Sequence, residues 1–280
     1  MGFLDGICYI RGVQILRAFV DGRARHARVE AAATGADTLW LLDGDPISGP
    51  AKVTGETLPL AGARLLVPCT PSKIVCVGLN YRAHAREMGK TLPDEPLLFF
   101  KPPSALLPTG EPIVRPRAPG APYERVDFEG ELGVVIGRRA RAVSVESALS
   151  YVFGYTIAND VTVRELQKKD GQFARAKGFD SFCPVGPSIT TADALVPQAL
   201  RLTTTLNGVV RQDTSTEDMV FSVAALIAFV SRVMTLEPGD LLSTGTPPGV
   251  ANLAPGDVVA ITIEGIGTLT NPVIDEPAWP

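Results

Sequence analysis

The sequence is poor in the side chains that bind soft metals and that cross-link secreted proteins. Its 280 residues include only two histidines and four cysteines: His26, His84, Cys8, Cys69, Cys76 and Cys183. No cysteines form a CxxC pair, and no histidine stands at zinc-ligand spacing from a cysteine. A zinc site is therefore not expected, any metal ligands should be oxygen atoms, and the cysteines are interpreted as small buried hydrophobic residues in a reduced compartment.

A positive charge excess and a long apolar segment are also lacking. Lysine and arginine number 26 against 30 acidic residues, and the resulting net charge of −4 argues against a nucleic-acid-binding surface. The longest apolar run, VAALIAFV at 223–230, is much shorter than a membrane span, and charged residues interrupt the N-terminus where a signal peptide would be apolar. No GxGxxG motif follows an expected strand, which argues against a nicotinamide enzyme. We therefore expect a soluble, cytoplasmic protein with neither nucleic-acid nor membrane partners.

Turn residues divide the chain into two expected domains. Residues 1–68 alternate short apolar runs with Gly and Asp turns, which predicts a small β-rich domain with a hairpin at Asp21-Gly22. The segment VPCTPSK at 67–73 marks the boundary, because proline ends regular elements. Residues 69–280 form the second domain, in which Pro-Gly turns precede apolar runs. This pattern favours an α+β, mostly β fold, a β-roll rather than a βαβ array.

Three elements of the second domain have clear local signals. KIVCVGLN predicts a strand that ends at Asn80, which is expected to cap a short helix over YRAHAREM, with Gly89 just beyond that helix. Asn207-Gly208 lies between two strand-like runs and predicts a second hairpin. Residues 215–235 predict the one long helix, because apolar residues recur at helical spacing and Pro238-Gly239 follows.

Carboxylates stand at alternate positions in DFEGELGVVIG, residues 127–137. In a strand, residues i and i+2 share a face about 7 Å apart, so Glu129 and Glu131 should point the same way. Their repulsion is roughly 0.6 kcal/mol in water and roughly 2.4 kcal/mol at an effective dielectric of about 20. An exposed strand tolerates such a pair, whereas a half-buried pair requires a cation or a raised pKa. The apolar VVI that follows favours burial, but both interpretations stay open.

Further residues that could take part in catalysis or ligand binding lie elsewhere in the chain. Asp160 ends the expected strand YVFGYTIAND; it could cap a helix, or it could join the two glutamates in a carboxylate site suited to Mg²⁺, Mn²⁺ or Ca²⁺. His84 and Glu87 are three residues apart on the expected helix, as in a general base or an ordinary surface pair. Lys177 stands alone, as solvent-facing lysines do. The loop STGTPPGV at 243–250 could hold a carboxylate through backbone N–H groups and Thr246, or could be a plain turn.

Seven separated stretches together resemble the fumarylacetoacetate hydrolase family, in the family's order, over residues 72–270. They are VGLNYRAHAREMG, FFKPPSALL, DFEGELGVVIG, YTIANDVTVRELQ, ARAKGFDSFCPVGP, LNGVVRQDTSTEDMVF and STGTPPGV. The first 70 residues are similar to the small N-terminal module of many members. The resemblance implies a β-roll catalytic domain, usually assembled as a homodimer.

The resemblance also implies roles for particular residues. The metal ligands would be Glu129, Glu131 and Asp160, holding Mg²⁺ or Mn²⁺, with Ca²⁺ as a substitute. A second set would surround the substrate: His84 and Glu87 activate water on a mobile lid, Lys177 stabilises an enolate, and Arg164, Gln167 and Thr246 contact the substrate carboxylate. Asp127 matches no ligand position and is interpreted as a flanking polar residue. We also expect residues 81–100 to be mobile and to close on the substrate.

The expected activity follows from these implied roles. A divalent-metal-dependent enzyme would act on 2-oxo or 1,3-diketo acids through a metal-bound enolate, by C–C hydrolysis, decarboxylation or tautomerisation. The form AKGFDSFCPVGP is most similar to the branch of hydroxyheptadienedioate and carboxymethyl-hydroxymuconate isomerases and of acylpyruvases, which places the activity in aromatic catabolism. Two alternatives are a cation-stabilised binding or structural protein without catalysis and a dedicated oxaloacetate decarboxylase.

Overall fold

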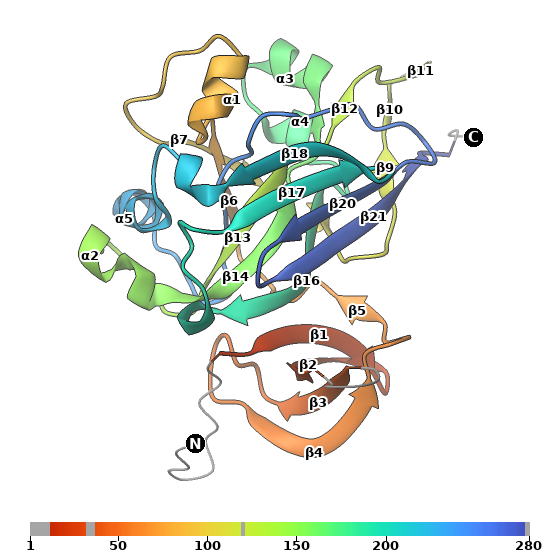
Figure 1. Ribbon diagram of the computed structural model, residues 1–280, viewed down its shortest axis with the longest axis vertical. Helices are drawn as coiled ribbons and strands as arrows, with labels where there is room; N and C mark the ends of the chain where they lie inside the picture. Colours follow the sequence, from red (N-terminus) through yellow and green to blue (C-terminus); the bar gives the residue numbers. More distant parts are fainter. Residues whose placement is uncertain (1–11, 32–36, 119–120, 278–280) are drawn as a thin grey trace.

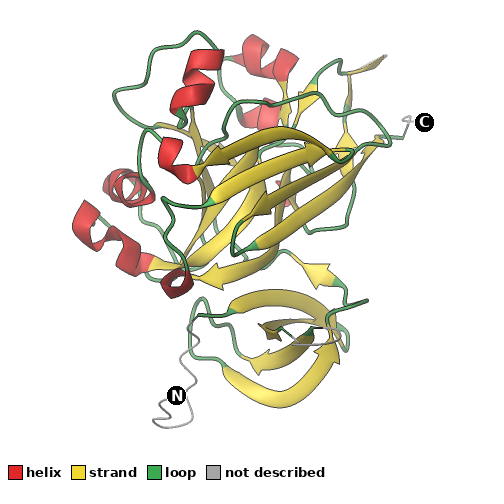
Figure 2. Ribbon diagram, viewed as in Figure 1, coloured by secondary structure: helices red, strands yellow, loops and turns green. Residues whose placement is uncertain are grey.

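The computed structural model describes residues 12–31, 37–118 and 121–277, and within these ranges the chain is mostly β (Figures 1 and 2). Its strands form a 12-stranded sheet, a five-stranded sheet and two two-stranded ribbons, with short helices around them. The mostly β fold with a small N-terminal β module is thereby confirmed.

The N-terminal module is an antiparallel arrangement of short strands (lower part of Figure 1). They are β1 (Gln14–Val20), β2 (Arg23–Glu30), β3 (Thr38–Asp43), β4 (Lys52–Pro59) and β5 (Leu65–Leu66). The chain turns between β1 and β2 at Asp21 and Gly22, where φ is 49° and 76°. Two consecutive positive φ angles match the twist of a tight hairpin, so the predicted turn is confirmed. The apolar faces of these strands form a separate small core around Leu16 and Leu39.

The central sheet runs from this module through the whole molecule. Its strand order is β4-β3-β2-β1-β16-β14-β13-β19-β6-β7, with β5 beside β1 and β8 beside β16. The further members are β6 (Ile74–Gly78), β7 (Leu97–Lys101), β8 (Leu106–Leu107), β13 (Gly130–Ile136), β14 (Val152–Asn159), β16 (Cys183–Thr191) and β19 (Leu241–Ser243). The module joins at β1, where Gln14 pairs with Thr190. Because the two parts share one hydrogen-bonded sheet, the division into residues 1–68 and 69–280 remains a proposal.

A second sheet lies across the first and completes the roll (Figure 1). Its order is β18-β17-β20-β21-β9. The strands are β9 (Ile113–Arg115), β17 (Arg201–Leu206), β18 (Val209–Ser215), β20 (Val258–Ile263) and β21 (Gly267–Asp275). The two ribbons are β10 (Arg117–Ala118) with β11 (Ala121–Pro122), and β12 (Val126–Asp127) with β15 (Thr162–Val163). The predicted hairpin at Asn207-Gly208 joins β17 to β18, with φ of 53° and 78°, and is confirmed.

Strand β13 lies between β14 and β19 and beneath the second sheet, and all seven of its residues are buried. Gly130, the first of the two glycines in this strand, has a packing reason. A Cβ on Gly130 would come within 2.5 Å of Thr204 Oγ1 and 2.8 Å of Gln212 Oε1. Only glycine therefore allows the two sheets to approach here, and this approach fixes the strand that carries Glu131.

Helices are few and short. They are α1 (Arg82–Glu87), α2 (Val145–Ala148), α3 (Arg164–Asp170), α4 (Ala174–Lys177) and α5 (Val223–Val233), with 3₁₀ turns η1 (Pro103–Ala105), η2 (Leu149–Tyr151), η3 (Ala192–Ala194) and η4 (Thr216–Asp218). No helix among the described residues is long and apolar enough to cross a membrane. Cys69, Cys76 and Cys183 are buried and unpaired, whereas Cys8 lies outside the described residues.

Two expectations about helix starts were wrong. Residue Tyr81, not Asn80, occupies the N-cap position of α1; the Asn80 side chain instead bonds the backbone of Phe221 and Thr244, which tethers two distant loops. The long helix begins at Val223, not at Ser215, because residues 216–218 form a separate 3₁₀ turn. Gly89 does follow α1, with φ of 62°, as expected.

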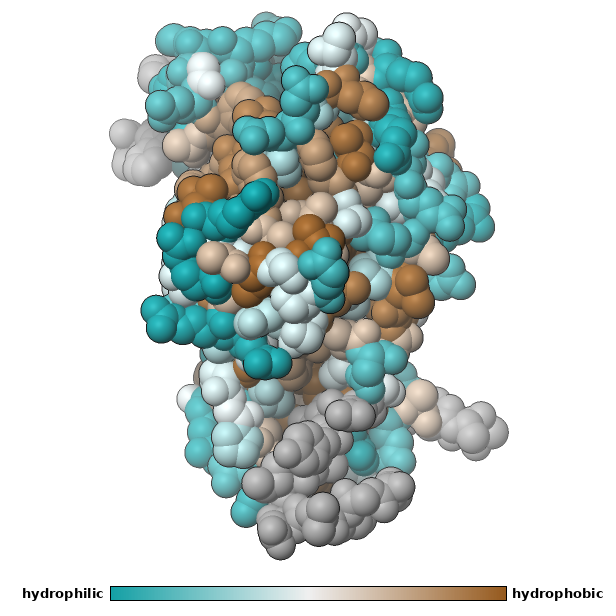
Figure 3. Space-filling view, turned by 90° about the vertical axis from the view of Figure 1, so that its left-hand side faces the viewer, coloured by the Kyte–Doolittle hydropathy of each residue, from teal (hydrophilic) through white to brown (hydrophobic). Residues whose placement is uncertain are grey.

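The face that presents α2 and α5 carries several exposed apolar side chains between charged ones (Figure 3). Val145, Leu149 and Val233 are 47%, 41% and 60% exposed. Scattered apolar residues are normal on a protein surface. The homodimer implied by the family resemblance therefore stays a prediction.

Candidate active site

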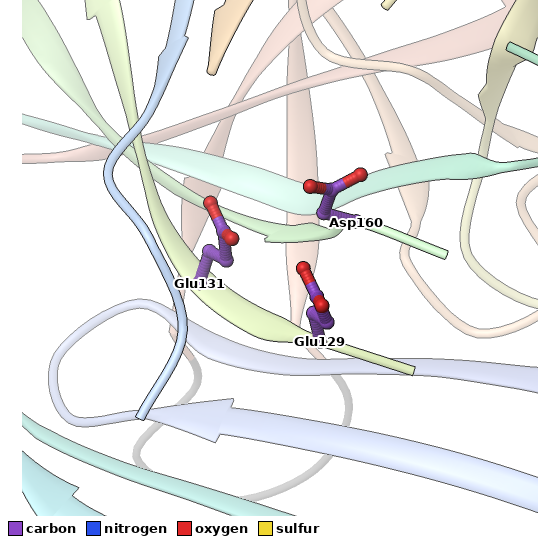
Figure 4. Close-up of side chains that lie close together, drawn as sticks. All are labelled: Glu129, Glu131 and Asp160. Carbon is purple, nitrogen blue, oxygen red and sulfur yellow. The ribbon is translucent and has the colours of Figure 1, made fainter. Parts of the chain in front are cut away.

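Strand pairing brings three carboxylates together. Glu131 lies on β13, Glu129 precedes that strand, and Asp160 follows β14. The two strands are antiparallel, and Asp160 N donates to Glu129 O at 2.9 Å. One carboxylate oxygen from each residue lies within 4.8 Å of the others, and all three side chains are buried (Figure 4). The exposed-strand interpretation of the two glutamates is therefore wrong.

Two buried lysines contact this triad. Lys177 Nζ lies 2.5 Å from Asp160 Oδ2 and 3.0 Å from Glu129 Oε2, and it also donates to Thr162 Oγ1 at 2.8 Å. Its side chain is 2% exposed, so the solvent-facing alternative does not hold. Lys101 Nζ donates to Asp160 Oδ1 at 2.6 Å and to Val161 O at 3.0 Å. Sequence reasoning missed Lys101, although a lysine that ends the apolar run LLFF was a usable signal.

Glu131 is the least compensated of the three acids. Within the described ranges no cationic side chain pairs with it; Ser243 Oγ and Gly245 N donate to its Oε2 at 2.5 and 2.9 Å. Burial, together with the negative charges of Asp160 and Glu129, raises the pKa of Glu131 to about 8. Burial also acts to raise the pKa of Glu129, but there the charges of Lys177 and Arg164 prevail and lower it to about 2.

The donor set fits a hard divalent cation. All three candidate ligand groups are carboxylates, which suit Mg²⁺ or Mn²⁺. Glu131 in addition forms no ion pair with a cationic side chain of the described residues, and a bound cation would supply the missing positive charge. Glu129, Glu131 and Asp160 are therefore the residues that would hold such an ion.

Asp127 has more than a flanking role, contrary to expectation. It is completely buried and accepts from two arginines: Arg125 Nε at 2.9 Å through Oδ1 and Arg164 Nε at 2.7 Å through Oδ2. The Nη2 of Arg164 lies 2.6 Å from Glu129 Oε1, and its Nη1 donates to Gln167 Oε1 at 2.9 Å. A chain of charge-assisted hydrogen bonds thus runs from Asp127 to the triad.

The His84–Glu87 pair forms as the spacing predicted. His84 Nδ1 lies 3.0 Å from Glu87 Oε2, and Gly249 N donates to Glu87 Oε1 at 3.3 Å. The histidine side chain is only 9% exposed, although the glutamate is 46% exposed. With Nδ1 donating to the carboxylate, Nε2 is the basic nitrogen, and the pair has the form of an oriented general base.

Thr246 lies at the site, but its hydroxyl is engaged in hydrogen bonds with other protein groups. Its Oγ1 donates to Gly130 O at 3.0 Å and accepts from Gln212 Nε2 at 2.8 Å. The backbone N–H of Thr246 is then the group that could reach a substrate carboxylate. Gln212 was missed by sequence reasoning; it also contacts Gly130 N through Oε1 at 3.2 Å and so fixes the start of β13.

Most of the residues proposed for the site line one cavity of about 650 Å³. Its walls include eight of the nine residues proposed from the sequence: His84, Glu87, Glu129, Glu131, Arg164, Gln167, Lys177 and Thr246. Asp160 lies just behind them, in contact with Lys177. Val77, Leu97, Phe99 and Phe173 supply apolar wall, so the cavity combines convergent polar groups with an apolar lining, as small-molecule sites do.

Comparisons with known proteins agree with this architecture. A model of the fumarylacetoacetate hydrolase C-terminal domain matches residues 73–274, and a model of the Rv2993c-like N-terminal domain matches residues 14–68. Protein Rv2993c of Mycobacterium tuberculosis is 49% identical over 227 residues, covering 81% of this chain and 84% of its own length. The oxaloacetate tautomerase YisK of Bacillus subtilis is 41% identical over 217 residues, 74% of this chain and 71% of its own length. The solved structure of 2-hydroxyhepta-2,4-diene-1,7-dioate isomerase from Mycobacterium marinum superposes with a TM-score of 0.86 at 43% identity, covering 95% of this chain and 100% of that one.

Proposed function

Because the chain belongs to the fumarylacetoacetate hydrolase family, we propose that it is an enzyme that moves a proton at the carbon beside the carbonyl of a 2-oxo acid, a keto–enol tautomerisation or isomerisation. The observation that carries this proposal is the meeting of three unlike groups in one cavity: the buried carboxylate triad, Lys177 and the His84–Glu87 pair. The names of the isomerase and tautomerase relatives support the same reaction class.

Each group has a chemical task in this reaction. A Mg²⁺ ion held by Glu129, Glu131 and Asp160 would polarise the 2-oxo carbonyl. His84 Nε2 accepts the proton when the C3–H bond breaks, and the bonding electrons move to the carbonyl oxygen. Lys177 places a positive charge where that oxyanion develops. Return of the proton to oxygen, or to another carbon of a conjugated substrate, completes the isomerisation.

The remaining side chains orient the substrate. Arg164 and Gln167 are joined by a hydrogen bond on the cavity wall, and Thr246 lines the same cavity. The three groups would hold the carboxylate beside the 2-oxo group. The apolar wall around Phe99 and Phe173 would exclude water, which favours proton return over hydrolysis.

A substrate panel tests the proposal. Purified protein with Mg²⁺ is incubated with enol-oxaloacetate, a hydroxymuconate-type diene and acylpyruvates, and products are identified by NMR. Tautomerised or isomerised product is expected, with EDTA abolishing turnover. Hydrolysis or decarboxylation products would instead favour the other reactions of the family, including a dedicated oxaloacetate decarboxylase.

Two variants assign the roles. His84→Gln is expected to lower kcat by roughly 10²- to 10⁴-fold, the usual worth of a general base, with cation affinity retained. Glu131→Gln should instead weaken Mn²⁺ binding measured by calorimetry. Absence of turnover for every compound would support a binding protein without catalysis. Turnover that survives both EDTA and Glu129→Ala would contradict metal-dependent catalysis.

A further inference from the structure

A pair of arginines lies on one wall of the cavity. Arg125 directly precedes β12 and Arg164 directly follows β15, and these strands pair so that Arg164 N donates to Arg125 O at 3.0 Å. The two side chains are thus cross-strand neighbours, and like charges at such positions repel. Asp127 offsets this repulsion, because its carboxylate accepts from the Nε of both arginines.

The two guanidinium groups differ in how many of their nitrogens donate to protein groups. Each of the three guanidinium nitrogens of Arg164 has a protein partner, since its Nε, Nη1 and Nη2 contact Asp127, Gln167 and Glu129. Arg125 uses only its Nε, toward Asp127; within the described residues its Nη1 and Nη2 have no protein partner. Its side chain is 56% exposed and lines the cavity. Two parallel N–H donors that are held in place but unused match the geometry of a carboxylate.

The position of Arg125 defines which carboxylate it would take. Arg164 bridges Asp127 and Glu129, so Arg125 lies one guanidinium farther from the triad, toward solvent. Lys168, four residues after Arg164 on α3, lines the same cavity and adds positive charge. A ligand with its 2-oxo end at the triad would therefore present its far end to Arg125.

We propose that Arg125 is a specificity-determining residue that binds a second, distal carboxylate of the substrate, so that the enzyme selects 2-oxo dicarboxylates over 2-oxo monocarboxylates. Asp127 is the positioning residue that orients Arg125 and Arg164 together. This inference rests on the proposed function for the placement of the 2-oxo end, but its test does not require turnover.

Calorimetric binding with Mg²⁺ present tests it with a matched pair of probes. 2-Oxoglutarate and 2-oxopentanoate have the same five-carbon chain and differ only in the distal carboxylate. Wild-type protein should bind 2-oxoglutarate at least about tenfold more tightly, the low end of the range for a hydrogen bond to a charged group because Arg125 is half exposed. Arg125→Met should bring the ratio of the two Kd values close to 1, and Arg125→Lys should restore part of it.

The control is Arg201→Met, which removes an exposed arginine paired with Asp213 outside the cavity and should leave the Kd ratio unchanged. Equal affinity of wild-type protein for both probes would overturn the inference, as would an equal loss for both probes in Arg125→Met. If no compound of the substrate panel is turned over but wild-type protein still binds 2-oxoglutarate more tightly than 2-oxopentanoate, the proposed reaction is contradicted and the distal carboxylate site is supported.

Discussion

Positive charge is distributed unevenly over the three candidate ligand residues. Among the residues that the structure describes, Asp160 contacts two ammonium groups, Glu129 contacts one ammonium and one guanidinium group, and Glu131 contacts no cationic group. A buried charge without a partner is costly. Each lysine therefore contributes to the stability of the fold as well as to the arrangement of the site.

Lys101→Met tests this coupling between site and stability. The substitution leaves Asp160 with one ammonium partner in a buried position, so the free energy of unfolding without metal should fall by roughly 3–5 kcal/mol. Saturating Mg²⁺ should stabilise the variant more than the wild type, because the cation replaces the missing charge and no longer faces Lys101. Urea unfolding with and without Mg²⁺ measures both effects.

Arg139→Met is the matched control for that experiment. It removes an exposed ion pair with Glu237 and should cost less than about 1 kcal/mol. An equal Mg²⁺ stabilisation of Lys101→Met and wild type would contradict the electrostatic account.

The sequence allowed only part of this site to be derived. Alternation placed Glu129 and Glu131 on one face, since strand periodicity is local. For Asp160 the sequence left a helix cap and a third carboxylate of the site both open, and only the family resemblance favoured the site, because its contact depends on the register between β13 and β14. Lys101 and Gln212 were not predicted, as each reaches the site from a strand that pairs or packs over a long sequence separation.

Helix α1 carries the His84–Glu87 pair and is expected to move. It has six residues, too few to be stable alone, and it is anchored by Arg82 Nη1 to Met219 O at 2.6 Å and by Ala83 N to Asp218 Oδ2 at 2.8 Å. Amide hydrogen exchange over residues 81–100 should be faster than over β13 and should slow when oxalate and Mg²⁺ are added. Equal protection in both conditions would contradict the mobile lid.

The start of α5 gives a second test at this scale. Ser222 Oγ accepts from Ala225 N at 3.2 Å, so Ser222→Ala should lower the free energy of unfolding by about 1 kcal/mol. Ser144 occupies the same position on α2 but makes no capping hydrogen bond, and Ser144→Ala should cost clearly less. Comparable losses in the two variants, measured by chemical denaturation, would argue against the cap.

The helix boundaries show where local signals fail. Apolar spacing alone extends the long helix back to Ser215, yet the backbone there turns to meet other segments: Thr216 N donates to Leu200 O and Val220 N donates to Asn80 O. Asn80 was favoured as a cap by residue type, but its amide is used to connect three distant segments. Hydrogen bonds between segments so far apart in the sequence cannot be predicted from a local residue pattern.

For the molecule as a whole, the protonation of His26 should contribute to the pH dependence of the free energy of unfolding. Burial lowers the pKa of His26 in the folded protein, although Asp45 at 3.7 Å opposes this effect and Arg17 reinforces it. The unfolded chain, with an ordinary pKa of 6.5, then binds more protons than the folded chain in the window just below that value. The contribution of His26 to the free energy of unfolding should therefore be greatest above this window and should fall as the pH decreases through it.

Urea unfolding between about pH 5 and 8 checks this prediction, since the window lies around the ordinary histidine pKa. His26→Gln should remove this contribution from the profile, and Asp45→Asn should enlarge it by removing the only acidic side chain within ion-pair distance of His26 in the described chain. An unchanged profile in His26→Gln would show that other groups set the pH dependence.

The pairing of β1 with β16 also bears on how the protein can be divided experimentally. Ile15 and Gln14 cover backbone groups of β16 that would otherwise form an open sheet edge beside the roll. A fragment that starts after residue 68 would expose that edge to the edges of other copies. We therefore expect the N-terminal module to limit self-association, and its removal should reduce the soluble yield of the remaining β-roll before it affects the carboxylate triad.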